Sequence, residues 1–130
     1  MPDPIVFISR HRIKPGKLDG LRDLSRRGVP MIEANKPRTA ALLAYLVEDG
    51  SEATFVHAFA DAESFDAHLQ GADERSQPAY EFIEPQSFSI YGPASDWAID
   101  FMRREAAQVG VDLDLKPEYM GGFLRVQSPS

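Results

Sequence analysis

The sequence predicts an α+β fold with the ferredoxin-like element order β-α-β-β-α-β, followed by an extra helix and an extended arm. Two observations predict this order. An Asp49-Gly50 pair lies between two β-like segments and marks a hairpin. Segments with helical and with strand-like apolar spacing alternate on both sides of that hairpin. A length of 130 residues fits one domain over 1–130, with its core over 4–92 and the additional helix and arm over 93–130.

The first predicted strand covers residues 5–13, because Ile5 to Ile8 are consecutive apolar residues of the kind found in a strand covered on both faces. Pro15 and Gly16 then form a turn. A helix is predicted over 18–35 from its leucine spacing. Gly28 and Pro30 lie inside that helix, so we expect a kink or a break there.

The hairpin arms are predicted at 39–48 and 52–60. The first arm is rich in Ala and Leu and could pass for a helix, but the Asp49-Gly50 signal favours a strand. We expect a tight two-residue turn in which Asp49 and Gly50 supply the positive φ values.

Asp61 is the expected N-cap of the next helix, which carries Phe65 and Leu69 and weakens at Gly71. A short helical piece over 78–82 and a strand over 85–91 should follow. Ser95 is then expected to cap a helix that runs to about residue 108. Beyond Gly110, which closes that helix, the pattern predicts an alternating segment over 111–115 and a last short strand over 120–126.

The first three strands carry apolar residues at both parities, for example Phe7 beside Ile8 and Phe55 beside Val56. Helices can cover only one face of such a sheet. The other face therefore predicts a partner sheet and a homodimer.

Composition excludes several classes of function. The net charge of −6 argues against nucleic acid and against anionic membrane surfaces as partners. The absence of cysteine excludes disulfides, thiolate metal sites and cysteine nucleophiles. No signal-peptide pattern and no apolar run of membrane-spanning length is present, so a cytoplasmic protein is expected.

Two segments resemble the antibiotic biosynthesis monooxygenase family. They are IVFISRHRIKPGKLDGLRDL at the start and FVHAFADAESFDAHL over 55–69, and the resemblance extends over about 4–92. It implies a dimeric α/β barrel in which two sheets pack face to face and each protomer has a pocket between its sheet and its helices. It also implies oxidation of aromatic or quinol substrates by O₂ without a bound cofactor.

The sequence departs from that family at several positions. His57 stands where Glu is frequent, and Phe59 where Tyr is common. Relatives that degrade haem carry a Trp where this chain has His68 and a His where it has Pro78, and their first-strand Asn is absent here. These differences argue against haem degradation, and the region after Ser95 lies outside the resemblance.

His57 and His68 are the candidate catalytic residues, because imidazole titrates near neutral pH and can accept a proton from a substrate. Each also has a structural interpretation: His68 as a boundary residue bonded to backbone, and His57 as a residue of the partner interface. His11 lies between two arginines and is expected to be solvated.

Aromatic side chains could form the walls of a pocket for a planar ligand, although each is more often plain core. Tyr45 is the best placed of them and could donate a hydrogen bond to the substrate. The candidate substrate-binding residues are Tyr45, Phe59, Phe65, Tyr80 and Trp97. No His-x-x-x-His pair, Glu-x-x-His pair or phosphate loop is present, so neither a metal nor a nucleotide cofactor is expected.

The leading functional hypothesis is a cofactor-independent monooxygenase acting on a small aromatic, quinol or polyphenol. The alternative is a non-catalytic dimeric protein that binds small molecules or acts in a stress response. A third hypothesis is a cofactor-independent isomerase or cyclase on the same scaffold. An empty space between helices and sheet, and the histidine that enters it, would distinguish these hypotheses.

Overall fold

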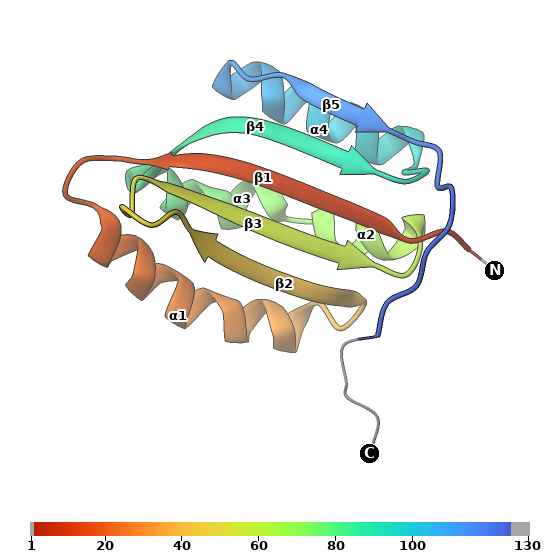
Figure 1. Ribbon diagram of the computed structural model, residues 1–130, viewed down its shortest axis with the longest axis horizontal. Helices are drawn as coiled ribbons and strands as arrows, with labels where there is room; N and C mark the ends of the chain where they lie inside the picture. The colour runs from red at the N-terminus through yellow and green to blue at the C-terminus, as the bar shows by residue number, and fades with distance from the viewer. Residues whose placement is uncertain (1, 126–130) are drawn as a thin grey trace.

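The computed structural model describes residues 2–125 and contains a five-stranded sheet in the order β2-β3-β1-β4-β5. In Figure 1, α2, α3 and α4 lie behind the sheet, while α1 runs along its β2 edge. The elements are β1 (Ile5–Ile13), α1 (Leu18–Asn35), β2 (Thr39–Leu46), β3 (Glu52–Phe59), α2 (Ala62–Leu69), α3 (Ala72–Ser76), the 3₁₀ helix η1 (Gln77–Glu81), β4 (Ile83–Tyr91), α4 (Asp96–Val109) and β5 (Leu113–Lys116).

The predicted ferredoxin-like fold is confirmed, with one addition at the sheet edge. β1 pairs antiparallel with both β3 and β4, and β2 pairs antiparallel with β3. β5 joins β4 in parallel, with Phe88 opposite Leu113 and Ile90 opposite Leu115. The alternating residues after Gly110 thus extend the sheet, and α4 is the crossover that a parallel pair requires.

Helix α1 runs without a break from Leu18 to Asn35, so a break at Gly28 and Pro30 is wrong, while a kink there stays a prediction. Pro30 removes one backbone donor from the helix. Leu21 is the one buried residue of α1 and belongs to the same cluster as Ile13.

The hairpin turn is longer than predicted. Gly50 alone has positive φ, at 74°, and its N–H donates to the Val47 carbonyl at 3.0 Å. The two central residues of the turn are therefore Glu48 and Asp49, and Gly50 follows in the left-handed region. This is a type I turn with a following glycine, in place of a tight turn centred on Asp49-Gly50.

Both predicted helix caps are present. The Asp61 side chain accepts a hydrogen bond from Ser64 N at 2.8 Å, and the Ser95 hydroxyl accepts one from Ala98 N at 3.0 Å. Each cap satisfies a backbone donor that the first turn of the helix leaves without a partner.

The predicted strand over 120–126 is not found in residues 120–125, and Val126 lies outside the described residues. Residues 117–125 form an extended arm without regular structure. Within the part of the chain that the structure describes, no helix has both the length and the apolar character that crossing a membrane requires.

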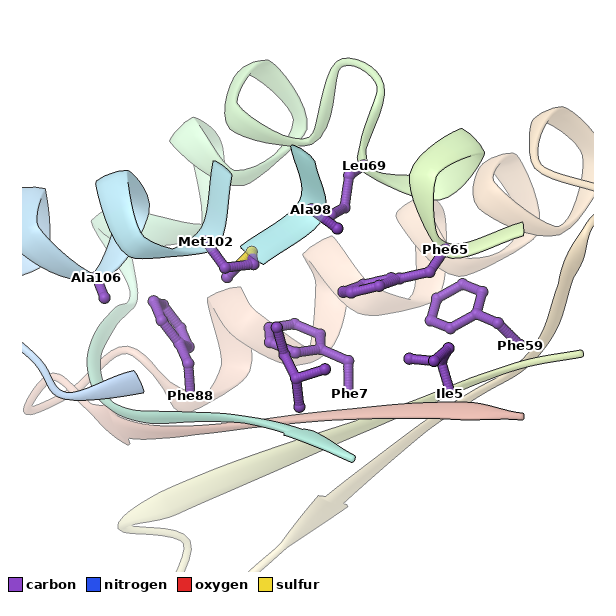
Figure 2. Close-up of a cluster of buried hydrophobic side chains, with 10 residues drawn as sticks. Ile5, Phe7, Phe59, Phe65, Leu69, Phe88, Ala98, Met102 and Ala106 are labelled. Atoms are coloured by element: carbon purple, nitrogen blue, oxygen red, sulfur yellow. The ribbon is translucent and has the colours of Figure 1, made fainter. Parts of the chain in front are cut away.

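The main core lies between the sheet and helices α2 and α4. In Figure 2, Phe7 and Phe88 rise from the strands toward Met102 and Phe65 on the helices. A second cluster of buried residues lies under α1 and η1 and consists of Ile13, Leu21, Ala53 and Ile83. Residues of both clusters line one cavity, which houses the candidate site.

Candidate functional site

A cavity of about 450 Å³ lies between the helix-covered face of the sheet and the helices. Phe7 and Phe55 belong to its floor, and residues of α1, α2, α3, η1 and α4 form its walls. Most of this lining is apolar, and its size suits a small organic molecule. The space between sheet and helices is therefore not filled by the protein's own side chains.

His57 and His68 meet in this cavity. On β3, His57 shares its parity with Phe55 and Phe59, so it points toward the helices. His68 projects from α2 and is only 6% exposed. The two rings meet edge to face, with centroids 5.1 Å apart. A strand and a helix that follow one another in sequence thus bring both predicted catalytic histidines together.

One ring nitrogen of His68 is fixed by the first residue of β2. The Thr39 hydroxyl and His68 Nδ1 form a hydrogen bond of 2.7 Å. When the Nδ1–H donates to Thr39, the Nε2 of His68 is left as a proton acceptor. The Nδ1 of His57 is buried and has no hydrogen-bond partner within the described residues.

Burial keeps both rings neutral at physiological pH. It lowers the pKa of His57 to about 4 and that of His68 to about 3, since a charged imidazole loses its hydration in an apolar cavity. The neighbouring His57 further opposes a charge on His68. Both rings can therefore act as neutral hydrogen-bonding groups across the range from about pH 5 to pH 8.

His11 is a third histidine in this cavity, so the prediction that it is solvated is wrong. It has the parity of Phe7 and Ser9 on β1, which directs it toward the helices, while Arg10 and Arg12 point the other way. Its Nδ1 has no partner within residues 2–125, and burial lowers its pKa to about 4. Strand parity in the sequence was the signal that could have identified it.

The predicted aromatic residues separate into three groups. Tyr80 lines the cavity, whereas Phe59 and Phe65 lie in the core beside it. Phe59 and His68 are neighbours, with ring centroids 5.2 Å apart. Both phenylalanines are almost fully buried and support the histidine pair from outside the cavity.

Tyr45 and Trp97 do not line this cavity, contrary to the expectation that they form its walls. Tyr45 pairs with Thr54 in the sheet register, so its side chain lies on the face of the sheet opposite to that of His57. The Tyr45 side chain is 57% exposed. Trp97 lies on α4 beside Phe101 and is 40% exposed. Neither belongs to the residues that surround the histidine pair in the cavity.

Sequence reasoning missed several polar residues of the cavity wall. Lys36 follows the end of α1, and Arg75 lies in the short α3 helix. No motif in the sequence connects them with His68. Within the described residues, no group of three or more His, Asp or Glu side chains is arranged to hold a metal ion.

The fold of the chain is similar to the small α+β folds of solved antibiotic biosynthesis monooxygenases and related oxygenases. No family model and no curated protein sequence matches the chain.

Three solved structures illustrate the likeness. MupZ from Pseudomonas fluorescens has 13% identity and a TM-score of 0.71, over 97% of this chain and 99% of MupZ. SnoaB from Streptomyces nogalater, a cofactor-independent oxygenase, has 11% identity and a TM-score of 0.58, over 72% of this chain and 95% of SnoaB. A putative antibiotic biosynthesis monooxygenase from Chloroflexus aurantiacus J-10-fl has 14% identity and a TM-score of 0.56, over 72% and 95%.

At these identities the likeness shows the fold. It confirms the ferredoxin-like α+β fold of the single chain, and the match to MupZ extends over nearly the whole chain.

Proposed function

We propose that the chain belongs functionally with the cofactor-independent oxygenases and oxidises a small phenolic aromatic or quinol in the cavity described above. The observation that carries this proposal is the pair of neutral histidines in an apolar cavity, His68 buried and His57 half-buried. The likeness to SnoaB supports the reaction class.

In the proposed reaction, the site first removes a proton from the substrate. An electron-rich phenolate or carbanion can then transfer an electron to O₂, and the resulting radicals combine to form a carbon–oxygen bond. For a substrate with a reactive CH₂ group, one oxygen atom becomes the carbonyl of the product. The second oxygen atom leaves as water with the two hydrogens that the substrate loses. The protein must supply a base, a donor for the developing negative charge and a site that excludes water.

We assign the base to the Nε2 of His68, whose pKa of about 3 belongs to the cavity without substrate and rises when the negative charge of the deprotonated substrate lies beside the ring. The Thr39 hydroxyl engages the opposite ring nitrogen, and Nε2 accepts a proton in the tautomer in which Nδ1–H donates to Thr39. His57 then serves as the donor to the substrate oxygen. In that arrangement its buried Nδ1 is an acceptor without a partner, which costs less than a buried N–H without one.

Two observations favour an enzyme over a non-catalytic protein with a purely structural role. The cavity is open, whereas a plugged space between helices and sheet would suit a purely structural role. His68 is buried in the cavity, whereas a solvated surface position would leave it without a substrate to contact.

The test is to supply the purified protein with a panel of anthrones, quinols and polyphenols and to follow O₂ consumption together with product absorbance. Active substrates should consume O₂ and give no product under nitrogen. Replacing His68 or His57 by alanine should lower the rate about 10²- to 10⁴-fold, the usual contribution of acid–base groups. Arg26→Ala is a matched control, because Arg26 contacts Asp23 on the surface of α1.

The absence of turnover across the whole panel would contradict the proposal. Turnover that is equally fast without O₂ would instead indicate the isomerase or cyclase.

A further inference from the structure

Two cationic side chains converge at the end of the cavity next to His68. The ammonium of Lys36 donates to the Gln70 carbonyl at 3.0 Å and to the Ala67 carbonyl at 3.0 Å. The guanidinium of Arg75 donates to the same Gln70 carbonyl at 2.8 Å, and also to the His68 carbonyl. Both side chains line the cavity. Two positive charges therefore share one carbonyl oxygen.

No carboxylate pairs directly with these charges, although Asp73 and Glu105 also line the cavity. Within the described residues, neither Lys36 nor Arg75 has an acidic group within 4.0 Å. Asp73 is near enough to influence Arg75 but forms no ion pair with it. By contrast, the nearby Arg38 contacts both Asp61 and Glu63.

The end of α2 offsets only part of this positive charge. The carbonyls that Lys36 and Arg75 contact belong to its last turn and to the residue that follows, where the helix dipole amounts to about half a negative charge. The histidines of the cavity are neutral and add no charge at pH 7. Burial and the proximity of Arg75 lower the pKa of Lys36, in keeping with two cations that share the Gln70 carbonyl.

We infer that this end of the cavity binds an anionic group of the substrate, a carboxylate, while the aromatic part of the substrate lies over the apolar floor. Lys36 has one N–H left for such a group and Arg75 has three, after their contacts with the carbonyls of α2. A guanidinium and an ammonium together match the two oxygens of a carboxylate. The inference rests on the proposed function, since it names the class of substrate for the same cavity.

The position of the cations fits the proposed chemistry. Arg75 and Lys36 contact the backbone of His68 and of its neighbours, so a carboxylate bound there would lie beside the proposed base. It would fix one end of the substrate and hold the reacting carbon next to the imidazole.

The experiment compares two probes of the same shape, 2-naphthoic acid and 2-naphthamide, by isothermal titration at pH 7. We expect the acid to bind at least about tenfold more tightly than the amide, the usual effect of hydrogen bonds to charged groups. That preference should weaken as salt increases. Lys36→Met and Arg75→Met should each reduce it, and the double variant should abolish it.

Arg103→Met is the matched control, because it removes one positive charge from an exposed position of α4 outside the cavity. It should retain the full preference for the acid. Arg75→Lys keeps the charge and should retain part of the preference, which distinguishes anion binding from simple support of α2. Thermal melts of each variant verify that it is folded.

Equal binding of acid and amide by the wild-type protein would overturn the inference, and so would an unchanged preference in a folded double variant. The result is independent of turnover. A cation-dependent preference without any oxidation would contradict the proposed reaction alone, and oxidation without that preference would contradict this inference alone.

Discussion

The three histidines of the cavity illustrate how burial controls a titrating group. His11, His57 and His68 come from β1, β3 and α2, and each ring lies among aromatic side chains. A positive charge on any of them would lose its hydration without gaining a carboxylate partner. Their neutral forms are therefore the forms that the fold stabilises.

This arrangement predicts a loss of stability in mild acid. The folded-state pKa values are about 4, 4 and 3, below the ordinary value of 6.5 that applies to the unfolded chain. Between about pH 6.5 and pH 4 the unfolded state binds more protons, so the free energy of unfolding should fall as the pH falls. Each histidine should contribute about 1–2 kcal/mol to that loss between pH 7 and pH 5.

Urea unfolding at pH 7 and pH 5 measures this loss directly. His11→Asn removes one of the three titrating rings and should reduce the difference between the two pH values. A difference that is the same in the variant and in the wild type would show that His11 does not titrate in this way.

At the residue scale, the sequence indicated the histidine pair but not its surroundings. His57 and His68 were identifiable because a strand parity and a helical spacing placed both near buried aromatic residues. Lys36 and Arg75 were not identifiable from the sequence, because they come close to His68 only when the end of α1, the end of α2 and the short α3 helix meet in the fold. Tyr45 was misplaced because the parity of β2 depends on its register with β3.

At the element scale, two glycines with positive φ have different structural roles. Gly92 has φ of 103° and ends β4, and a Cβ there would lie 2.4 Å from the Pro4 carbonyl oxygen. Gly110 has φ of 73° and ends α4, and a Cβ built on Gly110 would have no atom within 4 Å. Gly92 is therefore required both by backbone conformation and by close packing, and Gly110 by conformation alone.

The prediction is that Gly92→Ala destabilises the protein more than Gly110→Ala does. Gly110→Ala should cost about 1–2 kcal/mol, the left-handed penalty for a residue with a Cβ. Gly92→Ala should cost more, because the chain must also shift away from Pro4. Urea midpoints of the two variants provide the comparison, and equal midpoints would contradict the packing role of Gly92.

Local signals predicted most of the elements and failed where long-range contacts decide. Asp61 and Ser95 were identifiable as caps from their own side chains. Helix α1 continues through Pro30 despite the local breaker signal, and the parallel pairing of β5 depends on where α4 returns the chain. Neither can be read from a short window of sequence.

At the scale of the whole molecule, the sheet face opposite the helices carries the apolar residues that led to the expectation of a dimer. We propose that this face packs against the same face of a second copy. Its apolar residues include Val6, Ile8, Leu43, Val56 and Ala58, which share the parity opposite to that of His57. Leu43 is 46% exposed in the isolated chain.

Light scattering at micromolar concentration should give the mass of a dimer for the wild-type protein. Leu43→Lys should shift it toward the monomer, because a buried ammonium without a partner opposes association. Ala34→Lys adds the same charge at an exposed position of α1 and should leave the mass unchanged. A wild-type monomer would contradict the proposal.

The position of β2 has a further consequence for the fate of a partly unfolded chain. β2 is an edge strand of eight residues without a single charge or proline, whereas the opposite edge, β5, is four residues long and carries Asp114 and Lys116. Long, uncharged edges recruit other extended chains through their free backbone groups. Aggregation of this protein should therefore begin at the segment Thr39–Leu46, and a charge introduced at Ala44 should slow it more than one introduced into β5.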